Sequence, residues 1–552
     1  MHRLATLNDP VPQLTDETRA VLGSIPAWWA GRAQRAGLPS PWRDWRRALP
    51  AAPVELIRGT DALARASAYD LGCAYTTSLL STDRLQHGCH YTPQVLAQAL
   101  WKELRNVPSG RTEDPAAGAG ALLLPAMRRR VRGLRSQSPQ KALTTIANEF
   151  VGSDLDPCAV WLGNAILAAE LLPIWAALPQ AEREPLRPIL HVRDGLEVRA
   201  GSLNAVTVLN PPYGRVRLDD AARQRWQHAL YGHANLYALF LAAAIERTAP
   251  GGLVGAVIPT SFLGGAYYQR LRALLAERAP LERLLVVGER SGVFANGVQQ
   301  ETCLAVFRRA STHGRVICAR QTVNGTVHRE SLGRPRLPLN GYGHRPWLLP
   351  RSPEDRLLVR RAGRLTATLA SYHWRVNTGP LVWNRHKPQI SHERSAAAVP
   401  ILWAADVSPE RVAPAPARDA QRWIVLQARD DFMRLAEPAV LVQRTTTPEQ
   451  PRRLIAGYLD AHTLERWGGV VVAENHVNVL RCTRSQGSLT PRVLVALLNS
   501  NTLDRLYRCL TGSVAVSAYE LQALPFPPKA TLHAWDRLAD EQLAAVIERF
   551  YG

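Results

Sequence analysis

Between about residues 88 and 310, apolar runs rich in β-branched residues alternate with stretches of helical period. The clearest apolar runs are 206–209, 252–258, 284–287 and 302–307, and the clearest helical stretch is 235–248. Strands that alternate with helices form a mainly parallel sheet, which binds its ligands at the carboxyl ends of the strands. The pattern therefore predicts an α/β domain and directs the search for a site to the residues that follow each strand.

Two further regions flank this domain. Residues 1–87 are rich in Trp and Arg and indicate short helices broken by proline. Such Trp residues can stack on nucleic acid, but they more often anchor a helical cap to the next domain. A stretch rich in Pro, Gly and Arg at 334–350 indicates a linker or long loop, and mixed strands and helices follow it. We therefore expect three parts, at 1–87, 88–330 and 331–552.

The charge of the chain is strongly positive. Its 67 Lys and Arg residues against 46 Asp and Glu give a net charge of +21. An excess of this kind favours a polyanionic partner, because neutralised phosphates release their counterions. A GC-rich genome is the alternative explanation for part of the arginine.

Cysteine usage and hydropathy bear on the compartment. The seven cysteines are scattered singly, without zinc-binding spacing, so we expect no metal site and a reducing cytoplasm. Residues 1–18 have no apolar segment like that of a signal peptide. The most apolar helical stretch, 164–179, contains Glu170 and Pro173, and we expect it to be interrupted and too short to span a bilayer.

Three loops carry acidic or small residues suited to a nucleoside ligand. The run Asp114-Pro115-Ala116-Ala117-Gly118-Ala119-Gly120 indicates a tight turn before a helix, although Arg111-Thr112-Glu113 ahead of it is polar where a strand is expected to be apolar. Asp154 follows a short strand pattern and suits ribose hydroxyls, with a helix-capping role as the alternative. Asp194 lies in a later loop.

The strongest signal is Asn210-Pro211-Pro212-Tyr213, directly after the apolar run 205–209. Two prolines make a rigid loop with few backbone donors. If the Asn210 side-chain oxygen and the Pro211 carbonyl each accept one N–H of an aromatic amine, its lone pair is freed and its developing positive charge is stabilised. The pattern therefore favours methylation of a planar nitrogen, with Tyr213 stacked on the base. A structural Pro-Pro turn is the alternative.

In this order the motifs resemble those of adenine-N6 DNA methyltransferases of restriction–modification systems, in the gamma arrangement typified by the Taq-type modification methylases. The resemblance covers about residues 88–310 and begins at Gly88-Cys89-His90-Tyr91-Thr92-Pro93. It implies a Rossmann-like core, with S-adenosyl-L-methionine as cofactor and Thr92 at its methionine carboxylate. The cofactor contacts implied by the resemblance are Tyr91, Thr92, Asp114, Ala116, Gly118, Asp154 and Asp194. Ala117 and Ala119 stand where the family usually has Cys and Ser.

The same resemblance extends to the DNA. It implies that Phe294, in the run 291–294, packs on a flipped target adenine together with Tyr213. The C-terminal part matches the family's mixed α+β target-recognition domain more loosely. Arg444, Arg452 and Arg453 are its candidate contacts to phosphate or guanine, with ordinary surface charge as the alternative.

The expected protein is therefore a cytoplasmic, monomeric modification enzyme that acts on double-stranded DNA, with a cognate restriction endonuclease encoded separately. Asn-Pro-Pro-Tyr also occurs in protein-glutamine methyltransferases, and close variants occur in RNA enzymes. Methylation of cytosine N4 and a role as the recognition subunit of a larger phage-defence complex are further alternatives. The Tyr91-Thr92 element, the C-terminal domain and the positive charge favour DNA adenine.

Overall fold

The computed structural model describes residues 2–3, 14–39, 41–79, 91–198, 201, 203–287, 301–312, 315–324, 326–337, 343–409, 411–446, 450–484, 487–510 and 515–552. The chain divides into two compact units. The first comprises residues 1–262, 267–330 and 338–344, and the second comprises 263–266, 331–337 and 345–552. The N-terminal helices thus belong to the same unit as the alternating strands and helices.

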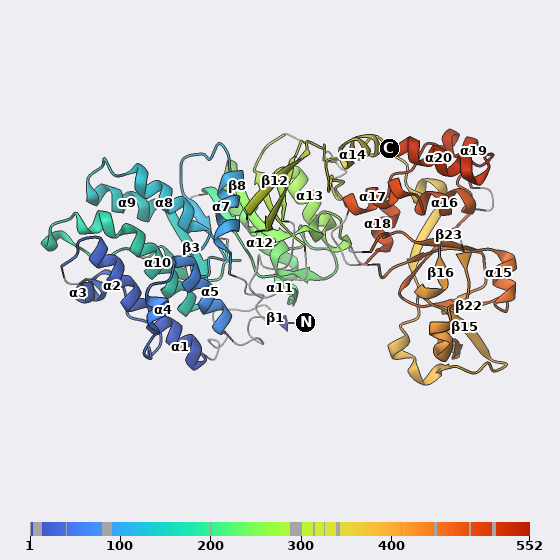
Figure 1. Cartoon of the computed structure of the whole chain (residues 1–552), viewed down its shortest axis with the longest axis horizontal. Coiled ribbons are helices and arrows are strands. Elements are labelled where there is room, and N and C mark those ends of the chain that lie inside the picture. The colour runs from blue at the N-terminus through green and yellow to red at the C-terminus, as the bar shows by residue number, and fades with distance from the viewer. Residues whose placement is uncertain are drawn as a thin grey trace. The chain divides into compact units, whose positions relative to one another are not determined.

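A nine-stranded sheet forms the centre of the first unit (Figure 1), in the order β12-β11-β9-β10-β8-β5-β2-β3-β4. Its strands are β2 (Thr112–Asp114), β3 (Phe150–Asp154), β4 (Leu190–Val192), β5 (Asn204–Leu209), β8 (Thr248–Pro259), β9 (Leu281–Val287), β10 (Thr302–Arg308), β11 (Ile317–Asn324) and β12 (Thr326–Gly333). Strands β4, β3, β2, β5 and β8 are parallel neighbours, whereas β10 runs antiparallel between β8 and β9. The α/β class is confirmed, and β10 runs against its two neighbours in the sheet.

Helices pack on this sheet, and the first unit also contains a separate three-stranded sheet. The helices of the first unit are α1 (Asp16–Gly23), α2 (Ile25–Arg35), α3 (Pro41–Ala48), α4 (Asp61–Ala64), α5 (Ala68–Ser78), α7 (Gln94–Glu103), α8 (Leu123–Gly133), α9 (Pro139–Glu149), α10 (Pro157–Ala176), α11 (Asp220–Arg225), α12 (Leu236–Arg247) and α13 (Gln269–Arg278). Helices α8 and α10 contact β3, and α12 contacts β5 and β8. The small sheet consists of β1 (His2–Arg3), β6 (Arg215–Arg217) and β7 (Ala234–Asn235), with β6 in the middle.

The interior strand β2 is polar and yet completely buried, and a network of charged and amide side chains explains how. Glu113 forms an ion pair with Arg247 at 3.3 Å and accepts a hydrogen bond from the Asn204 amide. The Asn204 oxygen in turn accepts from Arg111 Nε at 2.9 Å. A buried charge is tolerated when it is paired and hydrogen-bonded. The network therefore replaces the apolar side chains that the sequence pattern led us to expect in this strand.

Helix α10 corrects a second expectation. Glu170 and Pro173 do not interrupt it, and its 20 residues are long and apolar enough to cross a membrane. The same test finds no other such helix among the described residues, and 83% of its apolar window is buried inside the protein. Glu170 is paired with Arg128 at 2.6 Å. This is the core helix of the first unit, so its apolar character comes from packing on all sides.

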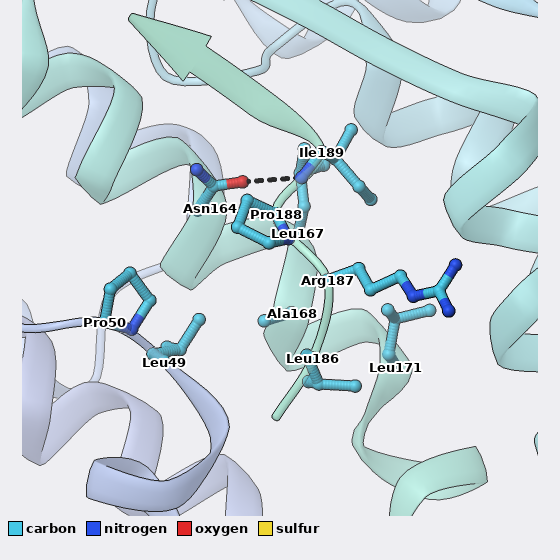
Figure 2. Close-up of a pocket in the computed structure, with 10 residues that line it drawn as sticks. All are labelled: Leu49, Pro50, Asn164, Leu167, Ala168, Leu171, Leu186, Arg187, Pro188 and Ile189. Carbon is cyan, nitrogen blue, oxygen red and sulfur yellow. Dashed lines mark hydrogen bonds between the residues drawn. The ribbon is translucent and has the colours of Figure 1, made fainter. Parts of the chain in front are cut away.

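Asn164 of α10 attaches the edge strand β4 to the helix. Its side-chain oxygen accepts from the N–H groups of Ile189 and Leu190, and its amide donates to the Leu190 carbonyl. Figure 2 shows this contact at the wall of a small pocket. The pocket is lined from α10, from the segment before β4 and from Leu49 and Pro50.

The N-terminal helices form a cap on α10, as expected for a helical extension. Trp28 and Trp29 of α2 are buried in the core that contains α10. Trp161 of α10 donates from its indole N–H to the Pro50 carbonyl at 3.2 Å. In Figure 1 the dark-blue helices α1–α5 accordingly lie beside α10. Tryptophan here supplies buried area and a directional hydrogen bond to the next part of the chain.

The second unit is a mixed α+β structure, as expected. It contains a four-stranded sheet β13-β23-β20-β21, a five-stranded sheet β14-β18-β15-β22-β19 and the pair β16-β17. Its strands are β13 (Trp374–Thr378), β14 (Ile390–Ser391), β15 (Ala398–Leu402), β16 (Val407–Ser408), β17 (Arg411–Val412), β18 (Trp423–Val425), β19 (Arg434–Leu435), β20 (Ala439–Gln443), β21 (Ala456–Leu459), β22 (Val471–Ala473) and β23 (Val477–Cys482). Its helices are α14 (Asp355–Ala362), α15 (Ala461–Arg466), α16 (Pro491–Leu498), α17 (Asn501–Leu510), α18 (Ala518–Ala523), α19 (Lys529–Trp535) and α20 (Asp540–Tyr551).

The network at β2 predicts the effect of removing one partner. Arg247→Met leaves the Glu113 carboxylate buried without its cation, and we expect this to lower the stability of the first unit by about 3–5 kcal/mol. Arg130→Met is the control, because Arg130 pairs with Glu149 at the surface and its side chain is 41% exposed. Loss of the Arg130–Glu149 ion pair should lower the stability of the unit by about 1 kcal/mol or less.

Hydrogen exchange of β2 and β5 peptides across a urea series measures the stability of this unit separately from the other. Equal shifts for the two variants would contradict a special role for the buried pair.

Candidate active site

The candidate residues lie at one edge of the sheet because three parallel strands end there. Asp114 is the last residue of β2 and pairs in register with Gly152 of β3, two residues before Asp154. Strand β5 lies on the other side of β2 and ends directly before Asn210. The chain proceeds outward from β2 in opposite directions, through β3 to β4 and through β5 to β8. Such a switch point leaves space for a ligand at the carboxyl ends of the strands.

The turn after β2 is held by backbone hydrogen bonds and by two carboxylates. Asp114 Oδ1 accepts from the Ala116 N–H at 3.0 Å, and Asp154 Oδ2 accepts from the Gly118 N–H at 2.8 Å. Gly118 and Gly120 have φ angles of +49° and +80°, which favour glycine. A Cβ added to Gly118 would meet no atom within 4 Å among the described residues. The turn is therefore rigid and open on that side.

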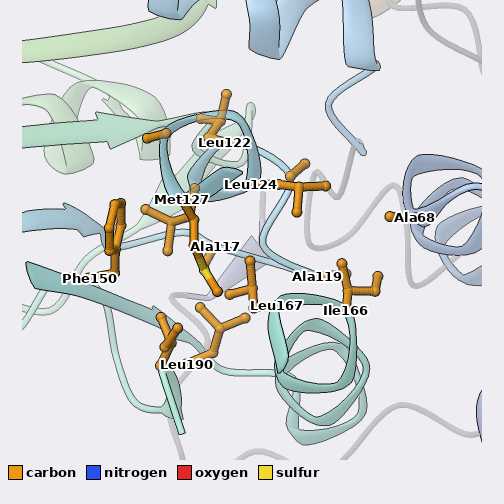
Figure 3. Packing of buried hydrophobic residues seen from close by; sticks show 14 of the residues in the cluster. Ala68, Ala117, Ala119, Leu122, Leu124, Met127, Phe150, Ile166, Leu167 and Leu190 are labelled. Carbon is orange, nitrogen blue, oxygen red and sulfur yellow. The ribbon is translucent and has the colours of Figure 1, made fainter. Parts of the chain in front are cut away.

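Ala117 and Ala119 face the protein interior. Both are buried, and Figure 3 shows them among the apolar side chains of the core, including Leu167 and Leu190. Ala117 also lies under β3, where a Cβ on Gly152 would be 2.9 Å from its own Cβ. Small apolar residues therefore fit these positions because of packing against β3 and α10.

Burial changes the acidity of the carboxyl groups around the turn. It raises the pKa of Asp154 to about 6, against the opposing effect of the N–H groups of Asp156 and Gly118. Burial also raises the pKa of Asp114 well above its usual range. Asp194 is half-buried, accepts from the Leu196 N–H at 2.8 Å, and has a pKa raised by burial. These three carboxyl groups are less acidic than carboxyl groups in water.

Asp194 is attached to the same turn through its neighbour. A Cβ on Gly195 would lie 1.8 Å from the Pro115 carbonyl oxygen, so the 194–195 loop packs directly on the turn after β2. Only glycine permits this approach. The structure thus brings Asp114, Asp154 and the loop of Asp194 into contact with the turn after β2.

The Asn210 loop is tied to Thr92 and Tyr213. Asn210 Nδ2 donates to Thr92 Oγ1 at 2.9 Å. The Tyr213 hydroxyl lies 3.1 Å from Asn210 Oδ1 and 3.0 Å from the Val257 carbonyl oxygen of β8. Gly214, with φ of +143°, accepts from the N–H of Leu236 at the start of α12. Thr92 and Tyr213 therefore hold the amide of Asn210, and Val257 and Leu236 hold the loop that follows it.

Two tyrosines behind this loop were not anticipated. The Tyr213 ring packs edge-to-face on Tyr237 at 6.2 Å, and Tyr237 stacks on Tyr268 at 5.1 Å. The Tyr237 hydroxyl is hydrogen-bonded to Ser261 at 2.9 Å. Tyr237 was visible in the sequence only as one more bulky residue within a helical stretch. The order of aromatic residues in space depends on the packing of α12 against β8, which sequence periodicity does not give.

Tyr91 is supported by the N-terminal extension. A Cβ on Gly72 of α5 would lie 2.1 Å from its ring, so ring and helix are in close contact. The Tyr91 hydroxyl is buried and has no hydrogen-bond partner among the described residues. Also on α5, the Tyr75 hydroxyl donates to Asp156 Oδ2 at 2.6 Å. Helix α5 therefore holds both the residue before Thr92 and the loop that carries Asp154.

The candidate DNA-contacting arginines of the second unit have protein partners. Arg444 is half-buried and donates to the Asn475 carbonyl at 3.0 Å. Arg452 is half-buried and donates to the Asn499 carbonyl and to Asn501. Arg453 is only 3% exposed, with its guanidinium 5.8 Å from the centre of the Tyr507 ring. Buried in this way, Arg453 supports the fold of its unit; the proposed DNA contacts of all three stay predictions.

Two other expectations concern residues around this site. Phe294 and the start of the Tyr91 motif, residues 88–90, lie outside the described residues. Within the described part of the chain, no group of three or more His, Cys, Asp or Glu residues is arranged to hold a metal ion.

Comparison with known proteins shows which families this chain resembles. Residues 205–294 match the Eco57I restriction-modification methylase family. The chain is 25% identical over 340 residues to the type II methyltransferase M.PstI of Providencia stuartii, and 23% identical over 329 residues to M.BsuBI of Bacillus subtilis. Each alignment covers 59% of this chain and 65% of the relative, so the matched part is less than two thirds of either relative.

A solved structure extends the likeness in fold beyond the core. The type IIL restriction-modification enzyme MmeI, solved in complex with DNA, aligns with a TM-score of 0.52 at 13% identity, over 90% of this chain and 77% of MmeI. At this identity the likeness concerns the fold alone. Residues 205–294 are thus similar to the Eco57I restriction-modification methylase family, and the chain resembles MmeI in fold.

Proposed function

We propose that this protein methylates the N6 amine of a flipped adenine in double-stranded DNA, with S-adenosyl-L-methionine as the methyl donor. The single observation that carries the proposal is the Asn210 loop, held at the end of β5 beside the turn after β2. The match of residues 205–294 to restriction-modification methylases and the net charge of +21 support DNA as the substrate. N6 is hydrogen-bonded within the duplex, so the adenine must leave the helix to react.

The residues around the turn fit the cofactor. The open side of Gly118 leaves room where a larger residue would project, and the Asp154 carboxylate next to it suits ribose hydroxyls. Thr92 accepts from Asn210, which leaves its hydroxyl proton available to donate to the methionine carboxylate. When bound, the cofactor supplies an electrophilic methyl group on a sulfonium. Tyr91, Asp114, Ala116 and Asp194 complete the proposed binding residues.

The chemical step depends on acceptors that the protein holds fixed. Asn210 Oδ1 and the Pro211 carbonyl accept the two N–H groups of the target amine, so its lone pair points away from the ring plane. These oxygens also stabilise the positive charge that develops on the nitrogen. The Tyr213 hydroxyl has one proton, shared between Asn210 Oδ1 and the Val257 carbonyl. The hydrogen bond from Tyr213 uses one lone pair of Asn210 Oδ1 and leaves the other for the target amine.

Asn210→Ala tests the proposal directly. It removes one of the two acceptors, and we expect methyl transfer to fall at least about 10²- to 10³-fold while the dissociation constant for the cofactor stays nearly unchanged. Tritium transfer to unmethylated plasmid DNA measures the rate, and calorimetry measures cofactor binding. Near-normal transfer by Asn210→Ala would contradict the assignment.

A sequencing experiment identifies the modified base. Single-molecule sequencing of DNA from cells that express the wild-type chain should report N6-methyladenine at one sequence motif. N4-methylcytosine, or no modified base at all, would reject the adenine assignment.

The hydrogen bond between Thr92 and Asn210 predicts that a change at Thr92 alters the rate of methyl transfer as well as cofactor binding. Thr92→Val removes the acceptor for Asn210 Nδ2, and we expect kcat at saturating cofactor to fall by about tenfold, the effect of one lost buried hydrogen bond. Thr92→Ser keeps the hydroxyl and should retain most of the rate. A Thr92→Val enzyme that binds the cofactor more weakly but keeps its kcat would limit Thr92 to cofactor binding.

Asp154 predicts a pH dependence of cofactor affinity. Burial raises the pKa of Asp154 to about 6, so the group is ionised above this pH and protonated below it. The ionised carboxylate is the better acceptor for ribose hydroxyls, and affinity should therefore fall by up to about tenfold per pH unit below pH 6. Calorimetric titrations between pH 5 and pH 8 measure this, with Asp154→Asn as the non-titrating control. A wild-type profile as flat as that of Asp154→Asn would argue against the ribose contact.

A further inference from the structure

An exposed aromatic and basic surface continues the row of tyrosines behind the Asn210 loop. The row runs from Tyr213 through Tyr237 to Tyr268. Tyr267, the preceding residue, is 41% exposed, which is unusual for a large aromatic side chain. The guanidinium of Arg215, two residues after Tyr213, lies 5.7 Å from the centre of the Tyr267 ring. The surface therefore begins where the catalytic loop ends.

His233 completes this group, which we call the Tyr267 surface (Arg215, His233 and Tyr267). The His233 ring packs edge-to-face on Tyr267 at 5.2 Å. Below it, a Cβ on Gly232 would lie 3.0 Å from the Tyr267 ring, so the ring rests on the 232–233 backbone. Arg223 of α11 donates to the Gly232 carbonyl at 3.4 Å. The ring is thus held by its surroundings while part of it stays exposed.

The Arg215 guanidinium belongs to strand β6. Val216 is buried, and Arg215 and Arg217 on either side of it are exposed, as expected for alternate positions of a strand. Strand β6 pairs with β1 on one side and with β7 on the other, so its backbone is fixed. Arg270, at the start of α13, is also exposed and donates to the Gln227 carbonyl. Three positive side chains and one tyrosine ring therefore share the region around the catalytic loop.

This combination suits one strand of nucleic acid. An exposed aromatic ring stacks on a base without regard to sequence, and a neighbouring guanidinium binds the adjoining phosphate. A flipped adenine interrupts base stacking in its own strand, so the neighbouring nucleotides offer an exposed base face and an accessible phosphate. We propose that the Tyr267 surface binds the DNA strand beside the target adenine, with Tyr267 on a base or sugar and Arg215 on a phosphate. This inference rests on the proposed function.

Substitutions at the surface separate this role from catalysis. With unmethylated plasmid DNA and tritiated cofactor, Tyr267→Leu should raise the KM for DNA by about tenfold, whereas Tyr267→Trp keeps a ring and should stay near wild type. Arg215→Gln should weaken binding and reduce the slope of log affinity against log salt by about one. The dissociation constant for the cofactor should not change in any of the three variants.

Arg132→Gln is the matched control. Arg132 is exposed on α8 of the same unit and belongs to neither the Asn210 loop nor the Tyr267 surface. Its substitution removes one positive charge, as Arg215→Gln does. Its KM for DNA should stay within about twofold of wild type, because exposed charges act over only about one Debye length. An unchanged KM in both Tyr267→Leu and Arg215→Gln, or an equal rise in Arg132→Gln, would overturn the inference.

A binding measurement separates a failure of this inference from a failure of the proposed function. If the wild-type chain transfers no methyl group to DNA, the proposed function fails, and fluorescence anisotropy with a labelled 30-nucleotide DNA and an RNA of the same sequence decides the role of the surface. A loss of DNA affinity in Tyr267→Leu and Arg215→Gln supports DNA binding. A loss confined to RNA, or to neither probe, overturns it.

Discussion

The buried ion pair between Glu113 and Arg247 is the interaction on which the arrangement of this protein depends. Glu113 lies in an interior strand of the nine-stranded sheet, and Arg247 is the last residue of α12, the helix that begins beside the Asn210 loop. Through Asn204 the same carboxylate is bonded to β5, the strand that ends at Asn210. One buried charge thus links the strand before the glycine turn, the strand before the Asn210 loop and the helix between β5 and β8. A sheet filled with apolar residues would pack as well but would not be tied in the same specific way.

Much of the site was predictable because its residues follow strands in sequence. The apolar run before Asn210 identifies both the strand and the loop, and the glycines after Asp114 indicate a turn whatever precedes it. Parallel strands then bring Asp114, Asp154 and Asn210 to one edge without further information. The polar strand β2 escaped recognition, because its compensating partners lie 91 and 134 residues away in the chain. No local pattern reports a partner at that distance.

The remaining differences have equally physical causes. Helix α10 continues through Pro173 because the surrounding core supplies packing that outweighs the cost of one lost backbone hydrogen bond. The row Tyr213–Tyr237–Tyr268 depends on how α12 lies against β8. Arg453 is a candidate contact by composition, yet burial beside Tyr507 gives it a role within its own unit. In each case the tertiary environment, which a window of sequence does not contain, decides the outcome.

Helix α5 has a consequence for the exchange of parts between this protein and its relatives. Gly72 admits the ring of Tyr91, and Tyr75 holds Asp156, so this helix shapes the cofactor side of the core although it precedes the first recognisable motif. A chimera joined just ahead of Tyr91 would inherit a foreign helix at both positions, and any residue larger than glycine at position 72 would displace the tyrosine. A crossover point for exchanging parts therefore lies upstream of α5, so that this helix is exchanged together with the α/β core.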